Sequence, residues 1–268
     1  MALPSFESSI DPGIRAQVEE KLLEIEGDHE VRVLFAVESG SRAWGFPSPD
    51  SDYDVRFVYV HALDWYLSLA PGRDVIELPI SDELDIAGWD LRKALNLLLK
   101  PNPVMLEWLS SPVHYRWQDE TCAALSALAE RTAPAAACLY HYLHLGETQW
   151  MRHVAQADTI KYKKYFYVLR PALAIRWVRL HPDVPPPMNI QAMSEGLALE
   201  PGIIDDISTL LAKKREARET ALGPRFVRLD ALIEQEFEWA RTAHPGKRKK
   251  ADLAQDAERL FRHLVKQA

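Results

Sequence analysis

The apolar residues of this chain change their spacing about a third of the way along it. Residues 31–37 (VRVLFAV) and 53–60 (YDVRFVYV) are short runs rich in β-branched and aromatic side chains, which is typical of strands. Residues 74–80 and 83–89 predict one or two more strands. From residue 91 onward, apolar residues recur at spacings of three and four, which predicts helices. The pattern therefore constrains the chain to a small sheet followed by a largely helical part.

A helix is also expected before the first strand. Asp11 is placed to cap it, and Pro12 suits its first turn, where a backbone N–H has no partner within the helix. Prolines and glycines punctuate the later segments and mark helix ends. We therefore expect an α+β fold, with a small mixed sheet and flanking helices in residues 1–114 and a helical domain in residues 115–268.

The composition excludes several classes of protein. No run approaches the roughly 18 apolar residues that a membrane span requires, and the first residues lack the order of a secretion signal. We therefore expect a cytoplasmic protein without a membrane partner. A net charge of -7 argues against a protein that coats nucleic acid, because such binding neutralises many phosphates. Cys122, Cys138 and the histidines show no zinc spacing, so a metal ion would be bound by oxygen.

Asp52 and Asp54 form an Asp-x-Asp pair at the start of the predicted second strand. Side chains alternate along a strand, so the two carboxylates would share a face, about 6 to 7 Å apart along the chain. Like charges at this distance repel each other unless a cation lies between them. Two Mg²⁺ ions about 4 Å apart, bound by carboxylates, can hold the attacking and leaving oxygens of a phosphoryl transfer. The pair therefore predicts a site for two Mg²⁺ ions, with Mn²⁺ as a substitute, whereas Asp50 is interpreted as a turn residue.

Gly40 and Ser41 end the first predicted strand and open a short helical segment. Backbone N–H groups at such a turn point toward a neighbouring ligand, and a glycine lets the chain approach a phosphate closely. Ser41 would add a hydroxyl group and Arg42 a positive charge. Asp52 follows Ser41 by eleven positions, and together these residues predict a site for a nucleoside triphosphate and its metal ions.

A Gly-Ser followed after about ten residues by Asp-x-Asp resembles the DNA polymerase beta-like nucleotidyltransferase superfamily. Three segments are similar, more narrowly, to the family named for a predicted RNA repair pathway polymerase beta: GSRAWGFPSPDSDYDVRFVYV, DIAGWDLRKALNLLLKPNPVMLEWLSSPVHY and KYKKYFYVLRPALAIRW. The resemblance covers about residues 30–180. It implies the transfer of a nucleoside monophosphate from a triphosphate such as ATP to an acceptor hydroxyl, with release of pyrophosphate.

The superfamily pattern also implies a third carboxylate from a later strand. Asp85 is the candidate, because it lies within the apolar residues 83–89, where an unpaired carboxylate would be costly without a cation. Asp82 and Asp90 are the alternatives. Asp82 is also interpretable as a turn residue, and Asp90 as the N-cap of the helix that follows.

The resemblance implies a role for each candidate residue. Asp52 and Asp54 would bind both ions. Asp85 would help to bind the catalytic ion and could accept the hydroxyl proton. Gly40 and Ser41 would hold the β- and γ-phosphates, and most of the rate would come from positioning and charge neutralisation.

Lysine and arginine residues cluster at residues 161–164, 213–215 and 247–250. The last two clusters are interpreted as a solvated helix face or a charged loop. In the first cluster, Lys161 and Lys164 flank an apolar helix stripe. Because helical-domain lysines of the superfamily bind the triphosphate, the resemblance implies this role for Lys161 and Lys164, with a solvated flank as the alternative.

The identity of the acceptor separates the remaining hypotheses. An RNA 3′ end fits the family resemblance, a protein side chain would make the protein an AMP-transferring enzyme, and a small molecule such as an aminoglycoside would make it a resistance-type enzyme. A non-catalytic nucleotide-binding or RNA-binding module on the same fold is the alternative from another class. The distinguishing feature is a third carboxylate that reaches Asp52 and Asp54 from a neighbouring strand.

Overall fold

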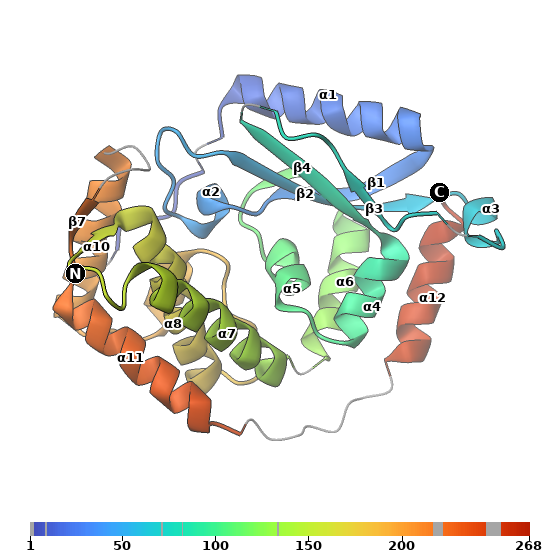
Figure 1. Cartoon of the computed structure of the whole chain (residues 1–268). Helices are drawn as coiled ribbons and strands as arrows, with labels where there is room; N and C mark the ends of the chain where they lie inside the picture. The colour runs from blue at the N-terminus through green and yellow to red at the C-terminus, as the bar shows by residue number, and fades with distance from the viewer. Residues whose placement is uncertain are drawn as a thin grey trace. The chain divides into compact units, whose positions relative to one another are not determined.

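The computed structural model divides the chain into two units, named here the sheet unit and the helical unit. The sheet unit consists of Ser8–Ala43, Asp52–Ala133 and Arg248–Ala268. The helical unit consists of Met1–Glu7, Trp44–Ser51 and Pro134–Lys247. Within them the structure describes residues 3–8, 10–70, 72–81, 83–132, 134–216, 222–244 and 253–268. Figure 1 labels the helices and strands of both units.

Five strands of the sheet unit form one mixed sheet in the order β3-β4-β2-β1-β5. The strands are β1 (Val31–Glu38), β2 (Tyr53–His61), β3 (Val75–Glu77), β4 (Leu84–Asp90) and β5 (His114–Trp117). β2 and β4 pair in parallel, and the other neighbours pair antiparallel. The α+β class with a small mixed sheet is thus confirmed. The strands expected from their β-branched and aromatic residues are β1 to β4, whereas β5 was not predicted.

Helices cover both faces of this sheet. The helices that begin in the sheet unit are α1 (Pro12–His29), α2 (Ser41–Trp44), α3 (Leu63–Tyr66), α4 (Leu91–Leu99), α5 (Pro103–Leu109), α6 (Asp119–Glu130) and α12 (Ala254–Val265). α1 lies on one face, and α4, α5 and α6 lie on the other side (Figure 1). The start of α1 is as predicted, because the side chain of Asp11 accepts hydrogen bonds from the backbone N–H groups of Gly13 and Ile14.

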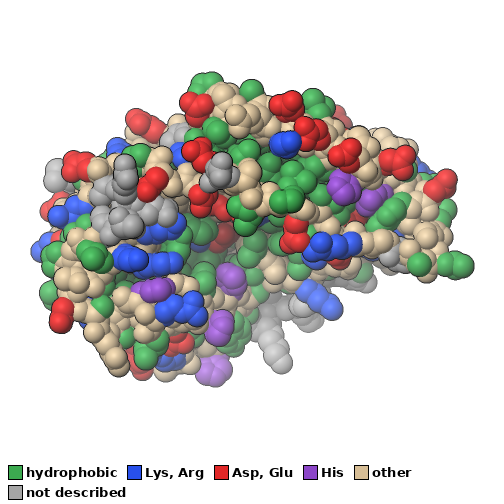
Figure 2. All heavy atoms as spheres, turned by 45° about the horizontal axis from the view of Figure 1, so that its top comes forward, with side chains coloured by type: hydrophobic (Ala, Val, Ile, Leu, Met, Phe, Trp, Pro, Cys, Tyr) green, Lys and Arg blue, Asp and Glu red, His purple; other side chains and the backbone are tan. Residues whose placement is uncertain are grey.

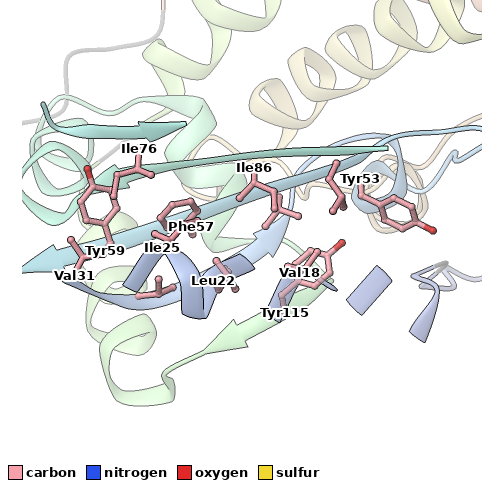
Figure 3. Close-up of a cluster of buried hydrophobic side chains, with 14 residues drawn as sticks. Val18, Leu22, Ile25, Val31, Tyr53, Phe57, Tyr59, Ile76, Ile86 and Tyr115 are labelled. Carbon is pink, nitrogen blue, oxygen red and sulfur yellow. The ribbon is translucent and has the colours of Figure 1, made fainter. Parts of the chain in front are cut away.

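α1 and the sheet enclose an apolar core (Figure 3). Leu22 of α1 packs in one buried cluster with Phe57 of β2 and Ile86 of β4. Because side chains alternate along a strand, the even-numbered residues near the start of β2 and the odd-numbered residues of β4 point to the opposite face. Asp54, Arg56 and Asp85 therefore lie on the face away from α1.

Helices dominate the helical unit. Its elements are α7 (Ala135–His153), β6 (Thr159–Lys161), α8 (Tyr162–Leu180), α9 (Ile190–Gly196), α10 (Pro201–Glu216), β7 (Leu222–Pro224) and α11 (Val227–Thr242). Glu236 of α11 is fully buried and accepts hydrogen bonds from Arg176 at 3.0 Å and Arg179 at 2.6 Å, which joins α11 to α8. In the described ranges, no helix combines the length and apolar character needed to cross a bilayer.

Residues 44–51 connect α2 with β2, yet they belong to the helical unit. The ring of Phe46 stacks on that of Phe166, with centroids 4.4 Å apart. The ammonium group of Lys214 is buried and donates a hydrogen bond to the carbonyl oxygen of Phe46 at 2.6 Å. Lys214 is therefore buried and does not lie on the solvated helix face expected for residues 213–215. The hydrogen bond compensates for the cost of burying its charge. The segment between the Gly-Ser turn and the Asp-x-Asp pair is thus held within the helical unit.

The two units differ from the domains expected from the sequence. β5 and α6 follow the expected boundary but belong to the sheet unit, because β5 pairs with β1 and α6 packs against α4 and α5. α12, close to the C-terminus, contacts α4 and α6. Hydrophobic spacing predicts the type of an element but not the element against which it packs.

Candidate active site

Glu38 ends β1 beside the Gly-Ser turn. Its Oε1 atom accepts hydrogen bonds from the backbone N–H of Gly40 at 3.3 Å and of Asp54 at 3.0 Å. Its Oε2 atom accepts a hydrogen bond from the hydroxyl of Tyr115 at 2.7 Å. The backbone N–H of Ser39 also donates to the carbonyl oxygen of Asp54 at 2.8 Å. Glu38 therefore holds the turn against β2 and β5.

Burial raises the pKa of Glu38, whose side chain is fully enclosed. The hydrogen bonds from Tyr115 and from the backbone oppose this rise, and the negative charge of Asp54 adds to it. Burial also raises the pKa of Tyr115, which keeps its hydroxyl protonated as a donor. Glu38 was not predicted from the sequence. The available signal was an acidic residue at the end of an apolar strand, two positions before the glycine.

Gly40 brings the turn directly against the carboxylate of Asp54. A Cβ atom added at Gly40 would lie 1.7 Å from Oδ2 and 2.6 Å from Cγ of Asp54. Atoms that are not bonded do not approach this closely, so any other residue at position 40 would displace the carboxylate. The glycine is thus required by Asp54 itself, whereas the predicted approach of a phosphate stays a prediction.

Arg42 is buried and contacts the chain at the Asp-x-Asp pair. Its Nε donates a hydrogen bond to the carbonyl oxygen of Asp52 at 3.3 Å, and its guanidinium carbon lies 3.8 Å from the centroid of the Tyr53 ring. Ser41 is also buried and begins α2, a helix of four residues. These contacts give Arg42 a structural role, and the predicted contacts of Arg42 and Ser41 with phosphate stay predictions.

Asp54 and Asp85 lie side by side on neighbouring parallel strands. They are register partners in the pairing of β2 with β4. Their side chains are 33% and 31% exposed, so both carboxylates are accessible from solvent. A carboxylate from a later strand therefore lies beside Asp54 of the Asp-x-Asp pair.

Asp52 differs from its expected place in a strand. It is exposed and lies one residue before β2. Pairing with β4 begins only at Tyr53, whose backbone N–H donates to the carbonyl oxygen of Glu83 at 2.8 Å. Strand alternation therefore does not place the side chain of Asp52 on the same face as that of Asp54.

Arg56 links the two neighbouring carboxylates. Its Nη2 lies 2.7 Å from Oδ2 of Asp85 and 3.5 Å from Oδ1 of Asp54. Its Nη1 donates to the carbonyl oxygens of Asp85 at 2.8 Å and of Val55 at 2.9 Å. Arg56 was not predicted from the sequence, although its spacing of two from Asp54 would have placed both on one strand face. Its single positive charge offsets part of the negative charge of the two aspartates.

The chemistry of the site fits Mg²⁺, which prefers oxygen ligands. Asp54 and Asp85 provide two carboxylates from adjacent strands, and Asp52 lies two residues before Asp54 in the chain. Among the residues that the structure describes, no three His, Cys, Asp or Glu side chains are grouped to hold a metal ion. The guanidinium group of Arg56 contacts the carboxylates instead, so a cation would compete with it for their oxygen atoms.

The contacts of Asp90 give it a structural role as a helix cap. Its buried carboxylate caps α4 by accepting the backbone N–H of Arg92 at 2.8 Å, and it accepts the hydroxyl of Tyr66 at 2.6 Å. The interpretation of Asp90 as an N-cap is confirmed. Asp82, the other alternative, lies outside the described residues. Asp85 stays the candidate third carboxylate, and the alternative of Asp82 is not tested.

Lys161 and Lys164 belong to the helical unit. Lys161 ends β6 and is exposed, and the ammonium group of Lys164 lies 5.0 Å from the centroid of the Tyr167 ring in α8. Their binding to a nucleotide stays a prediction. Residues 247–250 lie outside the described residues.

Comparisons with known proteins identify relatives over most of the chain. The sequence model of the RNA repair pathway DNA polymerase beta family matches residues 14–263. A Bacillus subtilis (strain 168) protein named Uncharacterized protein YcgL is 41% identical over 255 residues, covering 95% of this chain and 97% of that protein. The crystal structure of a nucleotidyltransferase-like protein from Exiguobacterium sibiricum 255-15 has 12% sequence identity and a TM-score of 0.29, covering 95% of this chain and 80% of that one.

Replacing Gly40 by alanine is expected to weaken the binding of Mg²⁺ together with a triphosphate by about tenfold or more. The added methyl group would force the Asp54 carboxylate to rotate away from the turn. Calorimetric titration of the folded variant measures the effect. Gly27→Ala is the control, because a Cβ at Gly27 meets nothing within 4 Å. Unchanged binding in Gly40→Ala would show that this position of Asp54 is not needed.

Replacing Glu38 by glutamine is expected to change how stability depends on pH. Burial raises the pKa of Glu38 above its ordinary 4.5, so the folded protein binds the proton more tightly than the unfolded chain. The unfolding free energy of the wild type, relative to Glu38→Gln, should therefore fall as the pH rises from about 4.5 through the raised pKa. Urea unfolding across this range measures the difference. A difference as flat as that for the exposed Glu20→Gln would contradict the account.

Proposed function

Because the chain belongs to the RNA repair pathway DNA polymerase beta family, we propose that it transfers a nucleoside monophosphate from a triphosphate to an acceptor hydroxyl. Mg²⁺ is the proposed cofactor, with Mn²⁺ as a substitute, and ATP is a candidate donor. The observation that carries the proposal is the pairing of Asp54 with Asp85, directly beside Gly40. Two adjacent accessible carboxylates next to a turn without side-chain bulk provide a place for a triphosphate and a cation.

Each residue of the candidate active site named below has a defined part in the proposed reaction. The acceptor oxygen forms a bond to the α-phosphorus, the bond from that phosphorus to the oxygen bridging the β-phosphate breaks, and pyrophosphate leaves. The carboxylate of Asp85 accepts the proton of the acceptor hydroxyl. Gly40 and Ser41 hold the leaving phosphates. Asp52, Asp54 and Asp85 would hold Mg²⁺, which when bound neutralises the charge on the reacting phosphates.

Arg56 has a proposed part as well. Its guanidinium group contacts both Asp54 and Asp85, so it lowers the repulsion between the two carboxylates when no metal ion or nucleotide is bound. In the proposed reaction it gives up at least one of these contacts. A freed guanidinium group is then available to a phosphate oxygen, for which its planar geometry is suited.

The proposed acceptor is an RNA 3′ end, a choice that is supported only by the RNA repair pathway in the family's description. Figure 2 shows charged side chains of both signs interspersed over one face of the molecule. The net charge of -7 favours recognition of an RNA end at the site over binding along an extended basic surface. Transfer to a protein side chain or to a small molecule is the alternative outcome of the test.

Replacing Asp85 by asparagine tests the proposal. Turnover should fall by about a hundredfold or more, because the proton acceptor and one carboxylate of the cation site are lost together. Triphosphate binding should fall much less, since Asp54 and the turn are retained. Transfer of label from α-labelled triphosphate to RNA measures turnover, and calorimetry measures binding.

The control for this experiment is Asp74→Asn, which removes an exposed aspartate that also forms an ion pair, with Lys93 at 3.1 Å. It should change neither turnover nor triphosphate binding. Intact turnover in Asp85→Asn would remove Asp85 from the proposed mechanism. Label that appears on protein or on a small molecule, and not on RNA, would identify a different acceptor.

A further inference from the structure

A pocket of about 510 Å³ lies beside Asp85 and Arg56 on the face of the sheet away from α1. The rings of Trp89 and Trp108, both of which line it, stack with centroids 3.9 Å apart. Trp108 is almost fully buried, whereas Ile80, which also lines the pocket, is 78% exposed. A volume of this size is typical of pockets that enclose a small molecule or one unit of a polymer.

The register of the strands explains the shape of the pocket. Residues of β2, β4 and β3 form three rows across this face: Asp54–Asp85, then Arg56–Ala87–Glu77, then Val58–Trp89–Val75. The middle row has the small Ala87 between two long side chains, which leaves a hollow. The pocket therefore runs from a charged row to an apolar and aromatic row.

The order of the strands gives this pocket a part in the proposed reaction. In-line phosphoryl transfer places the attacking oxygen and the leaving group on opposite sides of the phosphorus. If Gly40 at the end of β1 holds the leaving phosphates, the acceptor approaches from the other side of β2. The next strands in that direction are β4 and β3, which carry Asp85 and four further residues that line the pocket.

We propose that this pocket binds the 3′-terminal base of the acceptor RNA and so brings the terminal hydroxyl to Asp85. The inference rests on the proposed function, which it deepens by assigning the acceptor to a place on the sheet. A base has flat faces that stack on aromatic and aliphatic side chains, as the end of the pocket at Trp89 provides. Its polar edges match Arg56 and Glu77 in the middle row. A serine or threonine acceptor carries no ring to fill this space.

The test uses short RNA strands that carry 2-aminopurine, a base whose fluorescence falls when it stacks on an aromatic ring. One strand has the probe at its 3′ end, and the control strand has it at its 5′ end. Wild-type protein should quench the 3′ probe and not the 5′ probe. Ala87→Phe, which fills the hollow, should weaken binding of the 3′ probe by about tenfold or more. Ala87→Leu, a smaller addition, should have an intermediate effect.

The matched control is Ala127→Phe, because Ala127 is exposed on α6 and does not line the pocket. It should bind the 3′ probe as the wild type does. Thermal unfolding shows whether each variant is folded, and Ala87→Leu replaces Ala87→Phe as the decisive variant if the latter unfolds. Two results would overturn the inference. One is that the wild type does not quench the 3′ probe, and the other is that folded Ala87 variants bind the 3′ probe as tightly as the wild type does.

Pyrophosphate release, measured on the same proteins with a labelled triphosphate, separates this inference from the proposed function. If folded Ala87 variants transfer to any acceptor as fast as the wild type does, the pocket assignment is overturned and nucleotidyl transfer stays in place. Quenching of the 3′ probe without transfer to any acceptor would overturn the proposed function and leave the pocket as a site for an RNA end. Quenching and transfer that are both weakened in the Ala87 variants would support both.

Discussion

The buried carboxylate of Glu38 is the interaction on which the candidate site depends. It binds the backbone N–H groups of Gly40 and Asp54 and the hydroxyl of Tyr115, and so joins the ends of three strands. An uncompensated buried carboxylate would be costly, and these three donors offset that cost. Two of the donors are the backbone N–H groups of Gly40 and Asp54, so one carboxylate oxygen joins the Gly-Ser turn directly to β2.

The parallel pairing of β2 with β4 completes the site. It places Asp85 beside Asp54, and Arg56 offsets part of their negative charge when no ligand is bound. The same pairing puts Ala87 and Trp89 in the next rows, where the sheet opens into a pocket. One strand register thus creates both the proposed cation site and the proposed binding site for the acceptor base.

Local patterns predicted much of the fold and part of the site. Strands β1 to β4, the cap of α1 and the candidacies of Gly40, Asp54 and Asp85 follow from spacing, from turn chemistry and from a resemblance carried by local motifs. Glu38 and Lys214 were missed because their roles depend on long-range hydrogen bonds that no local pattern records. The unit boundaries differ from expectation for the same reason, since pairing and packing join segments far apart in the chain.

The most direct test of the central claim is anomalous diffraction from crystals grown with Mn²⁺ and a non-hydrolysable triphosphate. The account predicts a manganese peak within coordination distance of the carboxylates of Asp54 and Asp85, with Arg56 released from at least one of them. The Asp54→Asn variant should lose that peak. A nucleotide bound elsewhere, or manganese absent from these carboxylates while the pair of Arg56 with Asp85 stays intact, would contradict the account.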